Sequence, residues 1–133
     1  MIPSFDENGY LPPGVHGATM EEAAERFGQG SELRRVEIES LRWLVDLARQ
    51  AGVLRIVVNG SFVTGLLEPN DVDCVLLVGP DFQPNDPKNR ELLAELPFIS
   101  MQIVDQAGFD FFVQEFFATD RDTLPKGMIE ILP

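Results

Sequence analysis

The chain has 133 residues, enough for one domain with a single hydrophobic core but not for a catalytic domain with a separate substrate domain. Its formal net charge of -12 argues against an extended nucleic-acid surface, because phosphate binding depends on Lys and Arg, and makes a basic protein the easier partner to accommodate. The apolar fraction of 44% is ordinary for a globular protein, and no apolar run is long enough to cross a bilayer.

The amino-terminal segment and the cysteine content indicate a cytoplasmic protein. Asp6 and Glu7 stand where a signal peptide would need basic and then apolar residues, so no signal peptide is expected. The chain has one cysteine, which cannot form an internal disulfide.

The first residues contain too many helix breakers to form a helix. Residues 2–16 include three prolines and two glycines, so we predict an extended arm over residues 1–18, laid on a single domain that spans residues 1–133. His16 is the only histidine. A general-base or ligand role needs an orienting partner, so a structural role is favoured for it.

Two helices are predicted next. Thr19-Met20-Glu21-Glu22 fits a capping box that opens a short helix ending near Phe27. Ser31 can cap a longer helix through about Gln50, with an apolar stripe at helical spacing. The stripe comprises Leu33, Val36, Leu41, Leu44, Val45 and Ala48.

Arg34 and Arg35 lie in the first turn of the longer helix, where the helix dipole does not favour cations. A solvated helix face is the favoured interpretation of this pair. Salt bridging or contact with an anion is the alternative.

Residues 56–78, IVVNGSFVTGLLEPNDVDCVLLV, carry the strongest chemical signal. We predict a strand over 54–58, a tight turn at Gly60 and Ser61, and a second strand that begins with Asp71 and Asp73. Alternate residues of a strand share a face, so the two aspartates present their carboxylates side by side. Such a pair becomes favourable once a divalent cation binds between its members. Exposed amides and a hydroxyl at the turn can meet a phosphate, so the stretch indicates phosphoryl chemistry.

The rest of the chain alternates loops, a helix and β-like runs. Asp81–Lys88 is a polar loop, and Asp86-Pro87 opens a helix that ends before Pro97. Two strands are predicted over 98–104 and 109–117, separated by a turn at 107–108. The phenylalanines of the second run are interpreted as core residues. Lys126-Gly127 either offers a cation to a phosphate or marks the turn into a last edge strand.

Gly60-Ser61 followed by Asp71-Val72-Asp73 between two strands resembles the signature of the nucleotidyltransferase (polymerase-beta-like) superfamily. The resemblance extends to small bacterial and archaeal nucleotidyltransferase-like proteins of mostly unassigned function, the DUF6932-like proteins. Three segments carry it, namely IPSFDENGYLPPGVH at 2–16, GSFVTGLLEPNDVD at 60–73 and FFATDRDTLPKGMIEI at 116–131. It covers nearly the whole chain and implies an α/β fold, a small mixed sheet with helices packed on it.

Nucleotidyltransferases usually add a third carboxylate from a neighbouring strand. Asp110 is the best candidate, because a charged residue inside an apolar strand needs a partner or a metal. Asp105 and Glu115 are the alternates. Asp110 and Glu115 have opposite strand parity, so a regular strand could not place both in the site.

The resemblance implies transfer of a nucleoside monophosphate from a nucleoside triphosphate, with ATP the expected donor, to an acceptor hydroxyl. Two Mg²⁺ or Mn²⁺ ions would be held by Asp71, Asp73 and Asp110. The phosphates would be bound by the turn and by a lysine, a set that comprises Gly60, Ser61, Thr64 and Lys126. The acidic charge points to an acceptor on a basic protein, for instance a toxin encoded nearby. The alternatives are a catalytically silent binding module of antitoxin type and a purely structural oligomerisation domain.

Overall fold

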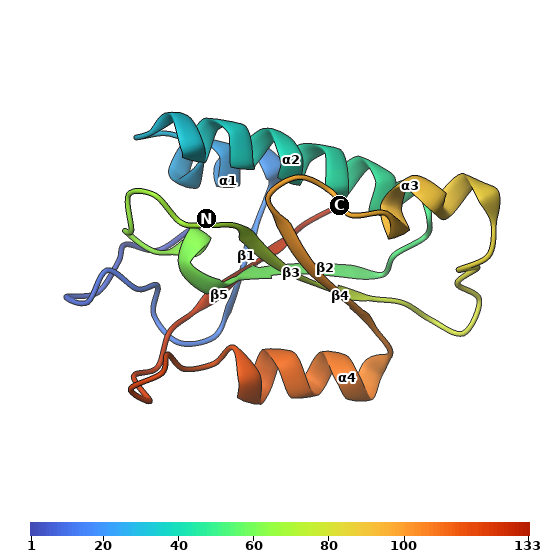
Figure 1. Cartoon of the computed structure of the whole chain (residues 1–133). Coiled ribbons are helices and arrows are strands. Elements are labelled where there is room, and N and C mark those ends of the chain that lie inside the picture. The colour runs from blue at the N-terminus through green and yellow to red at the C-terminus, as the bar shows by residue number, and fades with distance from the viewer.

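The computed structural model describes residues 1–133 and shows a mixed five-stranded sheet in the order β1-β5-β2-β3-β4 (Figure 1). Strand β2 runs antiparallel to both of its neighbours, whereas β1 with β5 and β3 with β4 are parallel pairs. The strands are β1 (Val15–Ala18), β2 (Arg55–Asn59), β3 (Val72–Leu77), β4 (Ile99–Val104) and β5 (Met128–Ile131). The helices are α1 (Met20–Phe27), α2 (Glu32–Gln50), α3 (Arg90–Leu93) and α4 (Gln106–Phe111). The α/β fold class with a small mixed sheet is confirmed.

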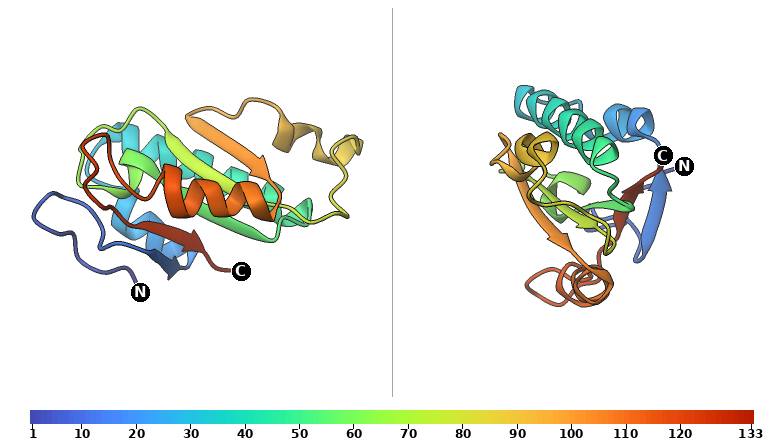
Figure 2. Two further views of the ribbon diagram at one scale, coloured as in Figure 1. Left: turned by 90° about the horizontal axis from the view of Figure 1, so that it is seen from below. Right: turned by 90° about the vertical axis from the view of Figure 1, so that its right-hand side faces the viewer.

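Helices cover both faces of the sheet. Figure 1 and the two views of Figure 2 show α1, α2 and α3 on one face and α4 on the other. Ile56 and Val58 join the larger hydrophobic core under α1 and α2, while Val57, between them, joins a second core with Phe109 of α4. This alternation explains why β2 is a continuous apolar run, as a strand buried on both faces must be. None of the helices combines the length and apolar character needed to cross a membrane.

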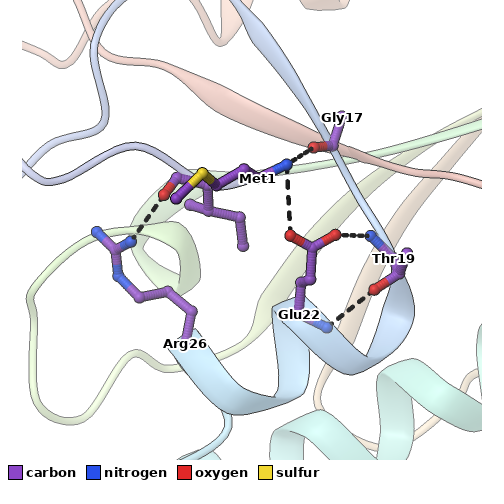
Figure 3. A network of polar contacts seen from close by, with 6 residues as sticks. Met1, Gly17, Thr19, Glu22 and Arg26 are labelled. Carbon is purple, nitrogen blue, oxygen red and sulfur yellow. Dashed lines mark hydrogen bonds and ion pairs between the residues drawn. The ribbon is translucent and has the colours of Figure 1, made fainter.

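The caps predicted for α1 and α2 are present. In α1 the Glu22 amide donates to Thr19 Oγ1 (3.1 Å), and the Thr19 amide donates to Glu22 Oε1 (3.0 Å). The Glu22 carboxylate also forms an ion pair with the Met1 ammonium at 3.3 Å, and this contact ties the start of the arm to α1 (Figure 3). In α2 the Ser31 hydroxyl accepts from the Arg34 amide. Both helices therefore begin where their side-chain acceptors satisfy free amides.

The amino-terminal arm is extended and lies on the domain, as predicted. Its last residues form edge strand β1, and Leu11 is fully buried. The Gly9 carbonyl accepts from the Gly65 amide (2.9 Å), and the Leu11 carbonyl accepts from the Gly127 amide (2.9 Å). The arm thus connects the turn after β2 to the start of β5.

The predicted strand over 109–117 is wrong, because this segment is helical. It forms α4 and a π-helical turn, η3 (Phe112–Phe116). Asp105 caps α4 by accepting from the Gly108 amide at 3.0 Å, so the expected turn at 107–108 lies inside the first helical turn. The phenylalanines that pack on the sheet recur at helical spacing. They are Phe109, Phe112 and Phe117.

The last strand also differs from its prediction. β5 was expected at an edge of the sheet, but it lies between β1 and β2. The reason is the arm, which returns alongside β5 as a parallel strand and pairs Val15 with Met128. Because β5 lies inside the sheet, its first residues and the preceding Lys126 are held close to the turn after β2.

Candidate functional site

The turn after β2 brings a carboxylate of β3 against a glycine. Gly60 opens a 3-10 turn, η1 (Gly60–Val63), and has a φ of +74°. The Asp73 carboxylate occupies the place that a Cβ atom on Gly60 would take. Only glycine satisfies both the backbone conformation and this close approach. The structure therefore brings the Gly60 turn and Asp73 into contact.

Asp73 is the centre of a polar row that crosses three strands. It pairs with Asn59 of β2 on one side and with Ser100 of β4 on the other. Directly paired residues of neighbouring strands project on the same face, so these side chains lie next to one another. Asn59 is 1% exposed, and neither atom of its amide group has a hydrogen-bond partner in the protein. A buried amide without a partner is costly, and a polar ligand beside Asp73 would satisfy it.

The electrostatic setting of Asp73 disfavours its charge. Burial, and then the nearby Asp71, raise the pKa of Asp73 to about 6, while Lys126 and a hydrogen bond with Ser100 act in the opposite direction. A bound cation would favour the charged carboxylate and so offset the effects of burial and of Asp71 on this pKa. The structure thus places Asp71 and Asp73 close enough to interact, with Lys126 in reach of the same carboxylate.

A surface cavity of about 570 Å³ lies at the turn that begins with Gly60, and the carboxylate of Asp73 is not among the groups that line it. One wall comes from the turn after β2 and includes Ser61 and Thr64, and Lys126 lines the cavity from the start of β5. The arm supplies the opposite wall with Glu7, Asn8, Gly9 and Tyr10. Three of the four residues predicted to bind phosphates therefore line one cavity. The fourth, Gly60, immediately precedes Ser61 in the chain.

The predicted phosphate-binding residues differ in whether their side chains already have partners within the protein. The Thr64 hydroxyl donates to the Ser61 carbonyl (2.6 Å) and accepts from the Leu66 amide (3.2 Å), so it shapes the loop. Lys126 takes part in none of the ion pairs of the molecule. The backbone next to Lys126 is held by a hydrogen bond that the Gly127 amide donates to the Leu11 carbonyl. Lys126 is therefore the cation that the fold leaves available to an anion in this cavity.

Asp110, the predicted third carboxylate, is not brought to Asp73. It lies on α4 and accepts from Gln106 Nε2 at 2.9 Å. The pKa of Arg55, at the opposite end of β2 from Gly60, is raised first by its hydrogen bond to Glu130 and to a smaller extent by Asp110. The prediction relied on a strand over 109–117, and the helix that forms instead turns Asp110 away. Asp105 caps the start of α4 at the same end of the sheet. Glu115 is exposed on η3.

The acidic groups of the structure do not reproduce the predicted metal ligands. No group of three or more His, Cys, Asp or Glu side chains is arranged to hold a metal ion. The oxygen atoms that remain beside each other belong to Asp71, Asp73 and the neutral Asn59 and Ser100. Mg²⁺ commonly takes one or two carboxylates and completes its shell with substrate phosphates and water. This donor set fits a cation that arrives with a triphosphate.

A buried arginine holds the loop that forms the cavity wall. Arg34 is 5% exposed, and its guanidinium donates five hydrogen bonds to four backbone carbonyls. One carbonyl belongs to the last residue of α1, and the others belong to the segment after Gly60. They are Phe27, Phe62, Thr64 and Leu66. The planar fork of Arg suits this task, because it presents five donors in a fixed geometry.

Glu37, one turn further along α2, is buried without a hydrogen-bond partner. Its side chain is 0% exposed, and neither carboxylate oxygen accepts a hydrogen bond. Burial raises the pKa of Glu37 to about 7, Arg34 lowers it, and Asp71 raises it further. Glu37 thus carries a negative charge toward the acidic pair only above about neutral pH.

A model of one protein family matches residues 3–132 of the chain. The chain belongs to the DUF6932 family. That family is described as a family of unknown function. No curated protein and no solved structure matches the chain. None of these comparisons links this DUF6932 protein to nucleotidyltransferases.

Asn59 and Glu37 were not predicted from the sequence as part of this site, and Arg34, for which a solvated helix face was the favoured interpretation, is buried. Asn59 is the polar residue that ends an apolar strand, which was a usable signal. Arg34 and Glu37 both fall on the buried face of α2, at helical spacing from Leu41 and Leu44. The apolar stripe included the exposed Val36 in place of Glu37, because hydropathy alone ranks a valine as the buried residue.

We expect Glu37→Gln to remove a pH-dependent loss of stability. The pKa of Glu37 in the folded protein, about 7, lies above its ordinary value of 4.5, so its contribution is favourable at low pH and is lost as pH rises through about 7. The neutral amide imitates the protonated acid. At about pH 8 the variant should be more stable by about 2 to 3 kcal/mol, and at about pH 5 the two proteins should be alike.

Urea unfolding of both proteins at the two pH values measures this difference. Asp73 titrates in both proteins, so its contribution cancels in the comparison. A variant less stable than the wild type at about pH 8 would mean that the ionised carboxylate has a favourable role.

Proposed function

We propose that this protein is a metal-dependent nucleotidyltransferase that moves a nucleoside monophosphate from a nucleoside triphosphate, with ATP the expected donor, to a hydroxyl on a basic protein. One observation carries the proposal. Asp73 lies against Gly60, and the turn that Gly60 opens contributes Ser61 and Thr64 to a cavity that Lys126 also lines. Phosphoryl transfer needs little more from a protein than positioning and charge stabilisation, and this cavity offers both.

The residues of the cavity divide the work of binding. Lys126 supplies positive charge, and the Ser61 hydroxyl supplies a donor at the start of the turn. Thr64 and Arg34 keep the loop in shape through bonds to its carbonyls. In a chain with a net charge of -12, a lysine in an anion-binding cavity is a specific feature rather than part of a basic surface.

The acidic pair would serve the reacting end of the triphosphate. A divalent cation bound with the triphosphate at Asp71 and Asp73 would neutralise phosphate charge and lower the pKa of the acceptor hydroxyl. Without a cation the pKa of Asp73 is about 6, and a divalent cation bound at the pair would favour its charged form. Its carboxylate is therefore a group that would hold the cation beside the reacting phosphate.

The acceptor is inferred from charge and size. A single domain with this acidity has neither a substrate domain nor a basic surface for RNA, so the hydroxyl would arrive on a protein that is itself basic. The buried Cys74 is the only cysteine and forms no disulfide, which suits a cytoplasmic setting. A toxin encoded near this gene is one such basic partner.

A second candidate function is a catalytically silent binding module of antitoxin type. The observation that favours it is that no third His, Cys, Asp or Glu side chain joins the acidic pair in a group that could hold a metal ion. Such a module would retain the fold and the partner surface without transferring a nucleotide. The two functions differ in one measurable respect, namely covalent labelling of the partner.

We expect transfer of label from α-³²P-labelled ATP to a protein of the host extract in the presence of Mg²⁺. Asp73→Asn should lower labelling by at least about 100-fold, because the carboxylate contacts the reacting groups. Asp110→Asn, which removes the same charge at the far end of the sheet, should label like the wild type. A stable complex without label would favour the silent module, and label on RNA alone would contradict the inferred acceptor.

A further inference from the structure

The outer face of α4 and η3 exposes large aromatic side chains. Phe111 is 47% exposed and Phe116 is 59% exposed, and their ring centroids are 6.2 Å apart. Both rings meet the edge of Phe112, at 5.2 Å and 5.6 Å, and Phe112 packs against the core under α4. The exposed rings are therefore held in place by a partly buried one. We call Phe111, Phe112 and Phe116 the aromatic patch.

A π-helical turn creates this patch. The Phe117 amide donates to the Phe112 carbonyl at 2.9 Å, a bond across five residues in place of four. In an α-helix, residues five apart such as 111 and 116 point in well-separated directions. The wider π turn brings them toward one face. Single π turns inside helices are frequent at functional sites, and here the turn exposes two aromatic rings that an α-helix would separate.

The segment that carries the aromatic patch is acidic. Residues 105–120 contain no Lys, Arg or His. Their acidic residues are Asp105, Asp110, Glu115 and Asp120. The cation that lies over Phe109 of α4 is Arg55, and it is already paired with Glu130. Glu115 lies between the two exposed rings in the chain, is exposed, and takes part in no ion pair. Figure 1 and the left view of Figure 2 show α4 alone on its face of the sheet, so no other helix covers the patch.

This combination of apolar rings and negative charge selects the kind of occupant. A second copy of the chain would bring Glu115 and its neighbours against like charges. Nucleic acid and anionic membrane surfaces would be repelled for the same reason. A basic protein segment gains on both counts, because its apolar residues can cover the rings and its Arg or Lys can lie over their faces.

We propose that the aromatic patch is a docking site for a basic amphipathic helix of a partner protein. The apolar side of that helix covers Phe111 and Phe116, and its flanking Lys and Arg residues pair with Glu115 and the neighbouring carboxylates. The patch is outside the nucleotide cavity, so docking does not require that the cavity be catalytic. Failure of one proposal would leave the other standing.

The test uses a fluorescein-labelled peptide with Leu at helical spacing and Lys elsewhere, and a twin in which Glu replaces Lys. Fluorescence anisotropy should show that the full chain binds the Lys peptide, that added salt weakens binding, and that the Glu twin does not bind. Phe111→Ser with Phe116→Ser keeps the net charge and should weaken binding at least about 10-fold. Val36→Ser with Leu93→Ser, exposed apolar residues away from the patch, should bind like the wild type.

Several outcomes would overturn this proposal. One is a wild type that does not bind the Lys peptide. A second is equal binding by the two Phe variants and the wild type, since this would reduce the interaction to net charge. Sedimentation provides the third, namely a wild-type dimer that the Phe111→Ser, Phe116→Ser variant dissociates, because the occupant would then be a second copy. Near-wild-type circular dichroism of the variant confirms that it is folded.

Discussion

Replacing Arg34 with methionine is expected to destabilise the fold by about 3 to 5 kcal/mol, because four buried carbonyls lose their charged donor at once. Methionine fills similar space but has no N–H group to donate. The affected carbonyls tie the end of α1 to the loop after Gly60, so the cavity wall should loosen together with the loss of global stability. Binding of ATP should weaken in the same variant for this reason.

Urea unfolding measures this effect, with Arg35→Met as the matched control. Arg35 is adjacent, exposed and without a hydrogen-bond partner for its side chain, so its replacement should change stability by less than about 0.5 kcal/mol. Arg34→Lys retains the charge but lacks the fork, and should recover only a part of the loss. Equal stability of the two methionine variants would show that the guanidinium bonds do not hold the loop.

Replacing Asp71 and Asp73 together with asparagine is expected to abolish stabilisation by divalent metal. In the wild type, Mg²⁺ or Mn²⁺ at about 100 times its dissociation constant should add roughly 2.7 kcal/mol of stability and raise Tm. The double variant loses the carboxylates that would hold the ion. Without metal it should be at least as stable as the wild type, because the repulsion and burial that raise the pKa of Asp73 are removed.

Thermal unfolding with and without metal provides this test. Asp46→Asn with Asp81→Asn removes the same charge from exposed positions and should keep the whole metal-induced shift. A shift that persists undiminished in the Asp71→Asn, Asp73→Asn variant would place the metal elsewhere, and the acidic pair would then have no assigned role.

The parts of the fold that follow from local chemistry could be predicted from the sequence. Thr19 and Ser31 accept bonds from amides three residues ahead, and such caps depend on neighbouring residues alone. The strand, turn and strand around Gly60 followed from an apolar run and a glycine. These elements contain the predicted residues that the structure brings together, from Gly60 and Ser61 to Asp73.

The remaining parts depend on packing between distant segments. Phenylalanine is compatible with a strand or a helix, and only the Asp105 cap and the sheet beneath decide that 106–116 is helical. The misplacement of Asp110 followed directly from that error. Arg34 is buried because the carbonyl that ends α1 and the carbonyls of the distant loop after Gly60 converge on it, and no local pattern in the sequence describes such a convergence.

Calorimetric titration of the protein with ATP, with and without Mg²⁺, tests the nucleotide site most directly. The proposed site predicts binding with Mg²⁺ present and little without it, because the acidic pair repels a bare triphosphate. Lys126→Ala should weaken the Mg²⁺-dependent binding about 10-fold or more, and Lys88→Ala, an exposed lysine on another loop, should leave it unchanged. Equal affinity with and without Mg²⁺, or full affinity in the Lys126→Ala variant, would contradict the assignment of this cavity.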